Sequence, residues 1–167
     1  MVKFMLEILN EINRNLIKII NDSEWKSLNV TYHAPRIERV YAPYGDYRVC
    51  LHVIHPCKPS EALFHPHPWP SAVRVVSGAY EMGVGYGDPN DSVPPEVGLI
   101  IAANKETQYE MTDPSMWHYV SPICRVLTVM VNGKPWKEVK SKSKPNLKSL
   151  PPNRQSEILN TFKNLKI

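Results

Sequence analysis

The chain has 167 residues, of which 43% are hydrophobic and 22% charged, as expected for one compact domain with a core of its own. The formal net charge of +4 is unevenly spread, because residues 134–167 hold nine Lys or Arg and two acids whereas residues 1–133 are net acidic. The three cysteines include no CxxC pair, which argues against a disulfide framework and favours a reducing compartment.

An amphipathic helix is predicted over residues 3–21, where apolar residues recur every three or four positions. Charged residues interrupt each long apolar run, so neither a signal peptide nor a membrane span fits this segment. We therefore expect a cytoplasmic protein that does not bind membranes. Ser23 is a candidate start for a short second turn that includes Trp25 and Leu28.

Short strand-like runs follow as far as residue 131. Residues 47–54 alternate apolar or aromatic with other side chains, and similar runs occupy residues 72–77, 80–86, 97–102, 107–111, 117–120 and 124–131. Turn-forming Gly, Pro, Asn and Asp separate these runs, and no helical periodicity lies between them. Many short strands with turn signals predict an all-β sandwich or barrel.

A stretch rich in Lys, Ser and Pro follows Gly133, and a second helix is predicted over about residues 153–164. The lysines within 137–148 are spread out without interleaved aromatic residues, so we expect a solvated linker and no binding of nucleic acid. The alternative is a basic tail that binds nucleic acid or an anionic membrane. The expected organisation is an N-terminal helical segment (1–28) packed on the barrel, a β-barrel with a metal site (29–133), and a basic linker with a C-terminal helix (134–167).

The segment LFHPHPWPSAVRVVSG places His65 and His67 two residues apart among prolines. In an extended chain, side chains at alternate positions point to the same face, so both imidazoles are expected to aim at one point. Pro66 and Pro68 lack an N–H and stiffen the backbone, which rules out a fully paired central strand. The alternative is that both histidines are surface residues of a Pro-rich loop.

A third ligand is needed, because two imidazoles alone bind a metal weakly. His118 lies between Trp117 and Tyr119, just before the last long strand-like run, and is our candidate. Neutral imidazoles suit zinc, copper, iron and nickel. We predict one divalent metal ion held by three histidines, with Fe(II) favoured and Zn or Ni open.

The order of these residues resembles the cupin superfamily, whose first motif reads G(x)5HxH(x)3–4E(x)6G. His65 and His67 match its histidines, Gly78 matches its closing glycine, and His118 matches the histidine of the second motif. The resemblance covers about residues 35–133. It implies a cupin-like double-stranded β-helix, or jelly-roll barrel, which the two predicted helices would flank on the outside.

The glutamate of that motif would fall at Ser71 or Ala72, so this chain offers three histidines and no acid. Such a set resembles the thiol dioxygenases, the cysteine dioxygenase branch of cupins, which bind ferrous iron with three histidines. In that branch an arginine about 26 residues before the pair holds the substrate carboxylate, and Arg39 stands at this offset. The branch also carries a tyrosine on the last strand, whereas this chain has Asn132 at that position.

Other polar residues are candidates for chemistry or recognition. The expected proton donors are Tyr80, Tyr109 and Tyr119, and Glu81 is a candidate base or orienting group. Each of these four is also open to a purely structural role. Arg48 and Arg74 join Arg39 as candidates for binding an anion, and Trp69 is a candidate wall of the pocket mouth or a packing residue beside its neighbouring prolines.

The predicted function is that of a mononuclear metal-dependent cupin, a non-haem iron dioxygenase that acts with dioxygen on a small polar substrate, a thiol or a carboxylate. Two alternatives are a non-catalytic, metal-stabilised barrel that binds a ligand and a metal-dependent isomerase or lyase. A homodimer is open by analogy with cupins alone.

Overall fold

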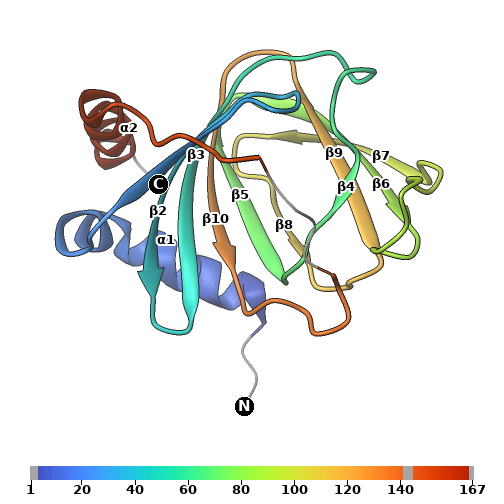
Figure 1. The fold of residues 1–167 in the computed structure, drawn as a ribbon. Coiled ribbons are helices and arrows are strands. Elements are labelled where there is room, and N and C mark those ends of the chain that lie inside the picture. Colours follow the sequence, from blue (N-terminus) through green and yellow to red (C-terminus); the bar gives the residue numbers. More distant parts are fainter. Residues whose placement is uncertain (1–3, 141–144, 166–167) are drawn as a thin grey trace.

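A computed structural model describes residues 4–140 and 145–165 of the chain. Two helices flank a β core (Figure 1). The elements are α1 (Met5–Asp22), β1 (Lys26–Val30), β2 (Ile37–Tyr44), β3 (Tyr47–Ile54), β4 (His65–Pro66), β5 (Ser71–Ser77), β6 (Ala79–Tyr86), β7 (Leu99–Asn104), β8 (Gln108–Met111), β9 (Met116–Pro122), β10 (Val126–Asn132) and α2 (Pro152–Asn164).

The strands form two sheets that face each other. The larger sheet has the order β1-β2-β3-β10-β5-β8 and the smaller sheet the order β4-β9-β6-β7, and each strand pairing is antiparallel. Both helices lie on the outer side of the larger sheet (Figure 1). This arrangement confirms the predicted fold class, a cupin-like barrel with flanking helices.

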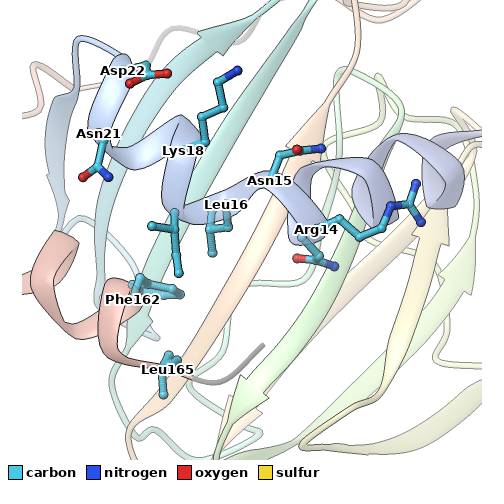
Figure 2. A pocket seen from close by; sticks show the side chains of 10 residues that line it. Arg14, Asn15, Leu16, Lys18, Asn21, Asp22, Phe162 and Leu165 are labelled. Carbon is cyan, nitrogen blue, oxygen red and sulfur yellow. The ribbon is translucent and has the colours of Figure 1, made fainter.

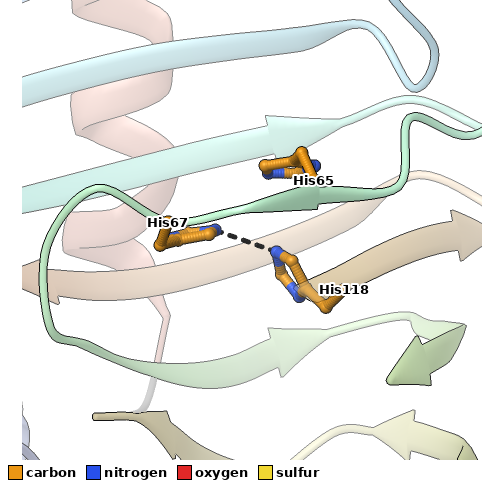
Figure 3. Close-up of side chains that lie close together, drawn as sticks. All are labelled: His65, His67 and His118. Carbon is orange, nitrogen blue, oxygen red and sulfur yellow. Dashed lines mark hydrogen bonds between the residues drawn. The ribbon is translucent and has the colours of Figure 1, made fainter. Parts of the chain in front are cut away.

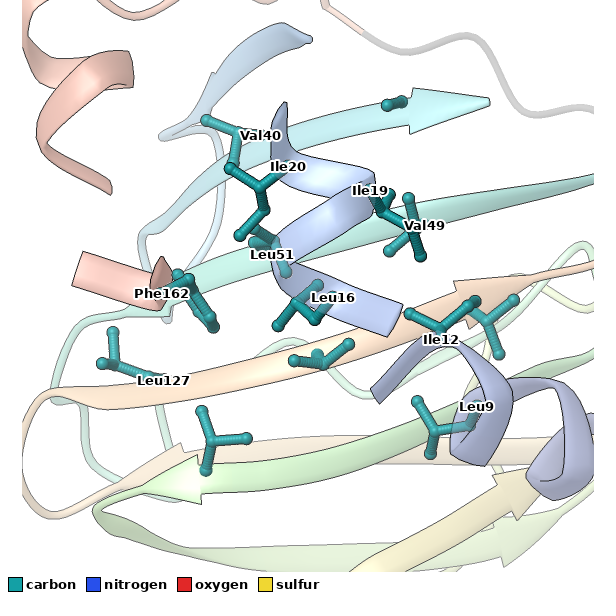
Figure 4. Close-up of a cluster of buried hydrophobic side chains, with 14 of the residues drawn as sticks. Leu9, Ile12, Leu16, Ile19, Ile20, Val40, Val49, Leu51, Leu127 and Phe162 are labelled. Carbon is teal, nitrogen blue, oxygen red and sulfur yellow. The ribbon is translucent and has the colours of Figure 1, made fainter. Parts of the chain in front are cut away.

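The helices cover the larger sheet with an apolar layer (Figure 4). One face of α1 is buried, and Leu9 and Ile12 have no exposed surface. Phe162 of α2 adds a 1% exposed ring to the same cluster. The Glu7 carboxylate accepts a hydrogen bond from the Phe4 backbone N–H at the start of α1, and Pro152 occupies the first position of α2, where a missing N–H costs nothing.

Alternation along the larger sheet separates two environments. In β3, Val49, Leu51 and Val53 pack under the helices, whereas Cys50 and His52 face the barrel interior. The neighbouring strands follow the same rule, because paired residues in a sheet share a face. The side chains that can take part in chemistry inside the barrel therefore come from alternate positions along each strand.

A tight turn at Gly78 joins β5 to β6. Its φ of +81° lies in the left-handed region, and a Cβ there would approach the Arg125 carbonyl oxygen to 2.7 Å. The glycine that closes the first motif is thus required by backbone conformation and by space.

Some elements differ from expectation. The turn expected around Trp25 and Leu28 is replaced by strand β1, whose residues pair with β2 along their whole length. Strand β2 was not among the predicted runs. Part of the basic stretch 137–148, residues 141–144, lies outside the described residues. No helix within the described ranges is long and apolar enough to cross a membrane.

Candidate metal centre

His65, His67 and His118 come together in the structure (Figure 3). His65 in β4 and His118 in β9 are direct partners across the antiparallel pair, so they share a face. His67 follows β4 by one residue, and its ring stacks on that of His65 with centroids 5.2 Å apart. One ligand atom from each histidine lies within 4.8 Å of the others.

The donor set fits a metal ion. The Nε2 atoms of His67 and His118 lie 2.9 Å apart, joined by a hydrogen bond. Two nitrogens bound to one metal at about 2.1 Å and at a right angle would be about 3.0 Å apart, so an ion can replace the shared proton with little movement. The Leu63 carbonyl accepts a hydrogen bond from His65 Nδ1 at 2.9 Å, which leaves the Nε2 lone pair of His65 for a ligand role.

His118 is suited to remain neutral. It is 6% exposed, and burial, with a smaller contribution from the charge of His65, lowers the pKa of His118 well below its ordinary value. A metal ligand must offer an unprotonated nitrogen, so this shift favours metal binding. Its Nδ1 has no hydrogen-bond partner within the described chain.

Arg39 faces the barrel interior and makes a polar chain with its neighbours. Its Nε donates to His52 Nε2 at 2.8 Å, and His52 Nδ1 lies 3.2 Å from Thr128 Oγ1. Because Nε2 accepts, Nδ1 carries the proton and His52 is neutral. Burial, followed by the charges of Arg39 and Arg48, lowers the pKa of His52 well below its ordinary value.

Arg48 and Trp69 meet near the histidines. The Arg48 guanidinium lies 4.8 Å from the ring centroid of Trp69, two residues after His67, and 5.6 Å from that of Tyr41. The structure therefore connects Trp69, predicted at the pocket mouth, with a cation rather than with prolines alone.

Tyr80 and Tyr109 face the interior and pair with each other. Their hydroxyl oxygens are 2.7 Å apart. His118 pairs with Val84, four residues along β6 from Tyr80, which is roughly 13 Å of strand. Burial, together with the neighbouring Tyr109, raises the pKa of Tyr80 well above its ordinary value, and burial raises the pKa of Tyr109 to about 12, so both keep their protons.

Tyr119 and Glu81 lie on the outer face of the smaller sheet. Tyr119 Oη donates to Glu81 Oε1 at 2.8 Å, and its ring covers Gly83, where a Cβ would come within 2.0 Å of a ring carbon. A residue next to His118 in a strand must point away from it, so the structure does not bring either group to the candidate centre. Arg74 likewise points outward and forms an ion pair with Glu106.

The two positions considered for the missing glutamate differ in orientation. Ser71 faces the interior, and its Oγ lies 3.4 Å from His67 Nδ1. Ala72 has no exposed surface and packs in the apolar layer under the helices. A side chain at position 72 therefore cannot reach a metal held by the three histidines, and of the two positions only Ser71 can correspond to the motif's glutamate.

One neighbour of the centre was not singled out from the sequence. The ring centroid of His33 lies 6.2 Å from that of His65, because residues 34 and 62 form a parallel bridge that brings the two loops together. No spacing in the sequence indicates this contact, which depends on the loop between β1 and β2.

A hollow of about 530 Å³ lies elsewhere, between α1 and the end of α2 (Figure 2). Leu16, Phe162 and Leu165 supply apolar surface to it, and Arg14 and Lys18 lie on its α1 side. None of the three histidines lines it, and the larger sheet separates it from the barrel interior.

No protein-family model and no curated protein matches the chain. Among solved structures it is similar to hydroxypropylphosphonic acid epoxidase from S. wedmorenis, with 13% identity, a TM-score of 0.50, and coverage of 65% of this chain and 55% of that one. A structure of Fe(II)-HppE with the alternative substrate (S)-1-HPP gives 12% identity, a TM-score of 0.51, and coverage of 65% and 56%. The chain spans about half the length of these proteins, and at this identity the likeness shows the fold alone.

Proposed function

We propose that the protein is a mononuclear metal-dependent oxidoreductase, an iron(II) dioxygenase that acts on a small polar substrate such as a thiol or a carboxylate. The observation that carries the proposal is the set of three imidazole nitrogens within 4.8 Å of one another. The similar structure of Fe(II)-HppE adds support by analogy of fold.

His65, His67 and His118 would hold the ion. Iron(II) held there would supply redox chemistry and open coordination positions for dioxygen and a substrate donor group. The chain's own contribution is to fix the ligands. The Leu63 carbonyl sets the tautomer of His65, and Ser71 Oγ stands beside His67 Nδ1.

Arg39 is the residue we expect to hold a distal carboxylate of the substrate. Its Nε is engaged by His52, which fixes the direction of the side chain, and a guanidinium held in this way suits a planar oxyanion. Tyr80 and Tyr109, whose hydroxyls are hydrogen-bonded inside the barrel, stay our candidate proton donors.

The test has two parts. Protein purified without chelator is analysed for metal, and Fe(II)-loaded protein prepared without oxygen is then screened with small thiols and carboxylates for oxygen uptake. We expect one ion per chain and uptake with at least one substrate, both lost in His118→Ala. His33→Ala removes the nearest other imidazole and is expected to retain one ion.

Zinc or no metal in the purified protein, together with no oxygen uptake by the iron form, would refute the dioxygenase. That result would favour the metal-stabilised binding protein instead.

A further inference from the structure

We infer that the barrel interior binds a small ligand with two negative charges, held by Arg39 and Arg48 together. The inference deepens the proposed function by naming the class of substrate, and it rests on that function only in treating the ligand as a substrate.

The first observation is an unbalanced charge. Arg39 and Arg48 both face the interior, and neither forms an ion pair with a carboxylate of the described residues. No Asp or Glu occupies an interior-facing position on any described strand. A partly enclosed cation without a counter-ion is costly, so two of them favour a bound anion.

The second observation is that the neighbours of these arginines carry no charge. His52, which accepts from Arg39, is neutral, and Thr128 beyond it is a hydroxyl. Arg48 rests on the faces of Trp69 and Tyr41, which leave the guanidinium charge in place. Its Nε is buried and has no hydrogen-bond partner in the described chain.

The third observation places both cations in one space. Cys50 lies on the interior face of β3 between them, two residues from Arg48 and two from the partner of Arg39. Burial raises the pKa of the Cys50 thiol, and the charges of Arg39 and Arg48 both oppose that rise. The Arg48 guanidinium lies 5.6 Å from the ring centroid of Tyr41, which pairs with Cys50 and is two residues from Arg39 on β2, so one ligand can meet both guanidiniums.

The position relative to the histidines suits a substrate. Arg48, Asn132 and Ser71 form one row across β3, β10 and β5, and Ser71 lies beside His67. An anion held at Arg48 therefore lies at the end of the barrel that carries the candidate metal centre. The shared chemistry is a pair of negative charges, carried either by one phosphonate group or by two carboxylates.

The experiment uses the full chain, metal-free and loaded with Fe(II) in the absence of oxygen. Methylphosphonate, succinate and propionate are titrated by calorimetry at alkaline pH, where the first two carry two charges and propionate carries one. We expect at least one doubly charged probe to bind about 10-fold or more tightly than propionate. A phosphonate preference indicates one head group between the arginines, and a succinate preference indicates one carboxylate at each.

Arg48→Gln and Arg39→Gln should each abolish that preference, and Arg74→Gln is the matched control because Arg74 points outward. The Trp69 indole N–H signal, assigned with Trp69→Phe, should shift on binding in the parent protein and not in Arg48→Gln. Unfolding curves establish that the variants are folded, and Arg48→Gln is decisive by itself if Arg39→Gln unfolds.

Equal binding of singly and doubly charged probes, unchanged binding in Arg48→Gln, or no binding of any probe would overturn the inference. If the protein binds doubly charged probes through both arginines but holds no metal, the anion site stands and the dioxygenase fails. If it holds one metal and shows no anion preference, the anion site fails and the proposed function stands.

Discussion

The alternating direction of side chains along β5 determines which of two adjacent residues can contribute a ligand to the candidate centre. Ser71 and Ala72 are neighbours in sequence, yet one faces the histidines and the other faces the apolar layer under α1. Adjacent residues in a strand point in opposite directions, so carboxylates at the two positions should have opposite effects.

Ser71→Glu should raise metal affinity about tenfold or more, because a carboxylate that extends past the His67 ring adds an anionic ligand to three neutral ones. Metal titration against a competing chelator measures the change. Ala72→Glu is the matched variant, and it should lower the free energy of unfolding by roughly 3 kcal/mol or more by burying an unpaired charge. Equal metal affinities in Ser71→Glu and the parent would show that position 71 does not reach the ion.

Two buried histidines should make the metal-free protein sensitive to mild acid. The pKa values of His52 and His118 are lowered in the folded state, mainly by burial, so below about pH 6.5 the unfolded chain binds protons that the folded chain does not. Stability should therefore fall as the pH drops from about 6.5 to 5, by up to roughly 1.4 kcal/mol per pH unit for each histidine. Urea unfolding at several pH values measures this slope, and His52→Gln should reduce it. A slope that is the same in His52→Gln and the parent would contradict the assignment to His52.

At the scale of elements, helix α2 is tied to the sheet by one buried carboxylate. Glu38 in β2 accepts hydrogen bonds from Arg154 Nε at 2.9 Å on Oε1 and from Nη2 at 2.8 Å on Oε2, and His55 Nε2 lies 2.9 Å from the same Oε2. Hydrogen bonding from Arg154, with smaller contributions from His55 and Arg36, lowers the pKa of Glu38 to about 2 against the opposing effect of burial. The ion pair between Glu38 and Arg154 holds the N-terminal turn of α2 against β2.

Glu38→Gln should lower the free energy of unfolding at neutral pH by up to about 3 kcal/mol, since the folded carboxylate titrates near pH 2 and the ordinary one near 4.5. In the parent protein this stability is present above about pH 4.5 and is lost as the pH falls toward 2. Chemical unfolding and amide exchange of α2 measure the effect. Glu157→Gln, which breaks the exposed contact of Arg154 with Glu157, should cost less than about 0.5 kcal/mol. Similar costs for the two variants would show that the Glu38 contact does not anchor the helix.

Strands were predicted correctly where apolar and polar residues alternate regularly, and were missed where polar residues occupy buried positions. The strand predicted over residues 47–54 has the bounds of β3, because tyrosine or apolar side chains occupy every other position from 47 to 53. In β2 the buried positions include Glu38, and the interior positions include Arg39, so the pattern of hydrophobicity does not match the pattern of burial. Hydrogen bonds with residues of α2 and β3 stabilise these polar side chains in the folded protein. Those partners are distant in sequence, so the local pattern does not reveal them.

The candidate centre shows the same division. The pairing of His65 and His67 follows from their spacing, whereas His118 was chosen for its position between aromatic residues and its match to the second cupin motif. The structure brings these three together. Local alternation would also have excluded Tyr119, which is adjacent to His118. The contacts of Arg48 with Trp69 and of His33 with His65 depend on loops and register that only the folded chain defines.

For the whole molecule, the larger sheet separates a structural side from a chemical side. Leu9→Ala should lower the free energy of unfolding by about 2–4 kcal/mol, because Leu9 is fully buried between α1 and the sheet. Metal stoichiometry and affinity should stay unchanged, since the histidines lie beyond the sheet. Thermal unfolding and metal titration of the same sample test both statements, and Ile17→Ala, at a position that is 57% exposed, is the control. A large loss of metal affinity in Leu9→Ala would show that the two sides are coupled.

The two-residue length of β4 has a consequence for how an ion would enter and leave. Two of the three histidines lie on or beside this edge strand, which pairs only with β9, whereas His118 sits on a strand paired on both sides. Opening residues 63–68 breaks few backbone hydrogen bonds and leaves the rest of the barrel folded, so ion exchange should be much faster than global unfolding. An ion would then be released by movement of His65 and His67 with this segment, while His118 stays in place on β9.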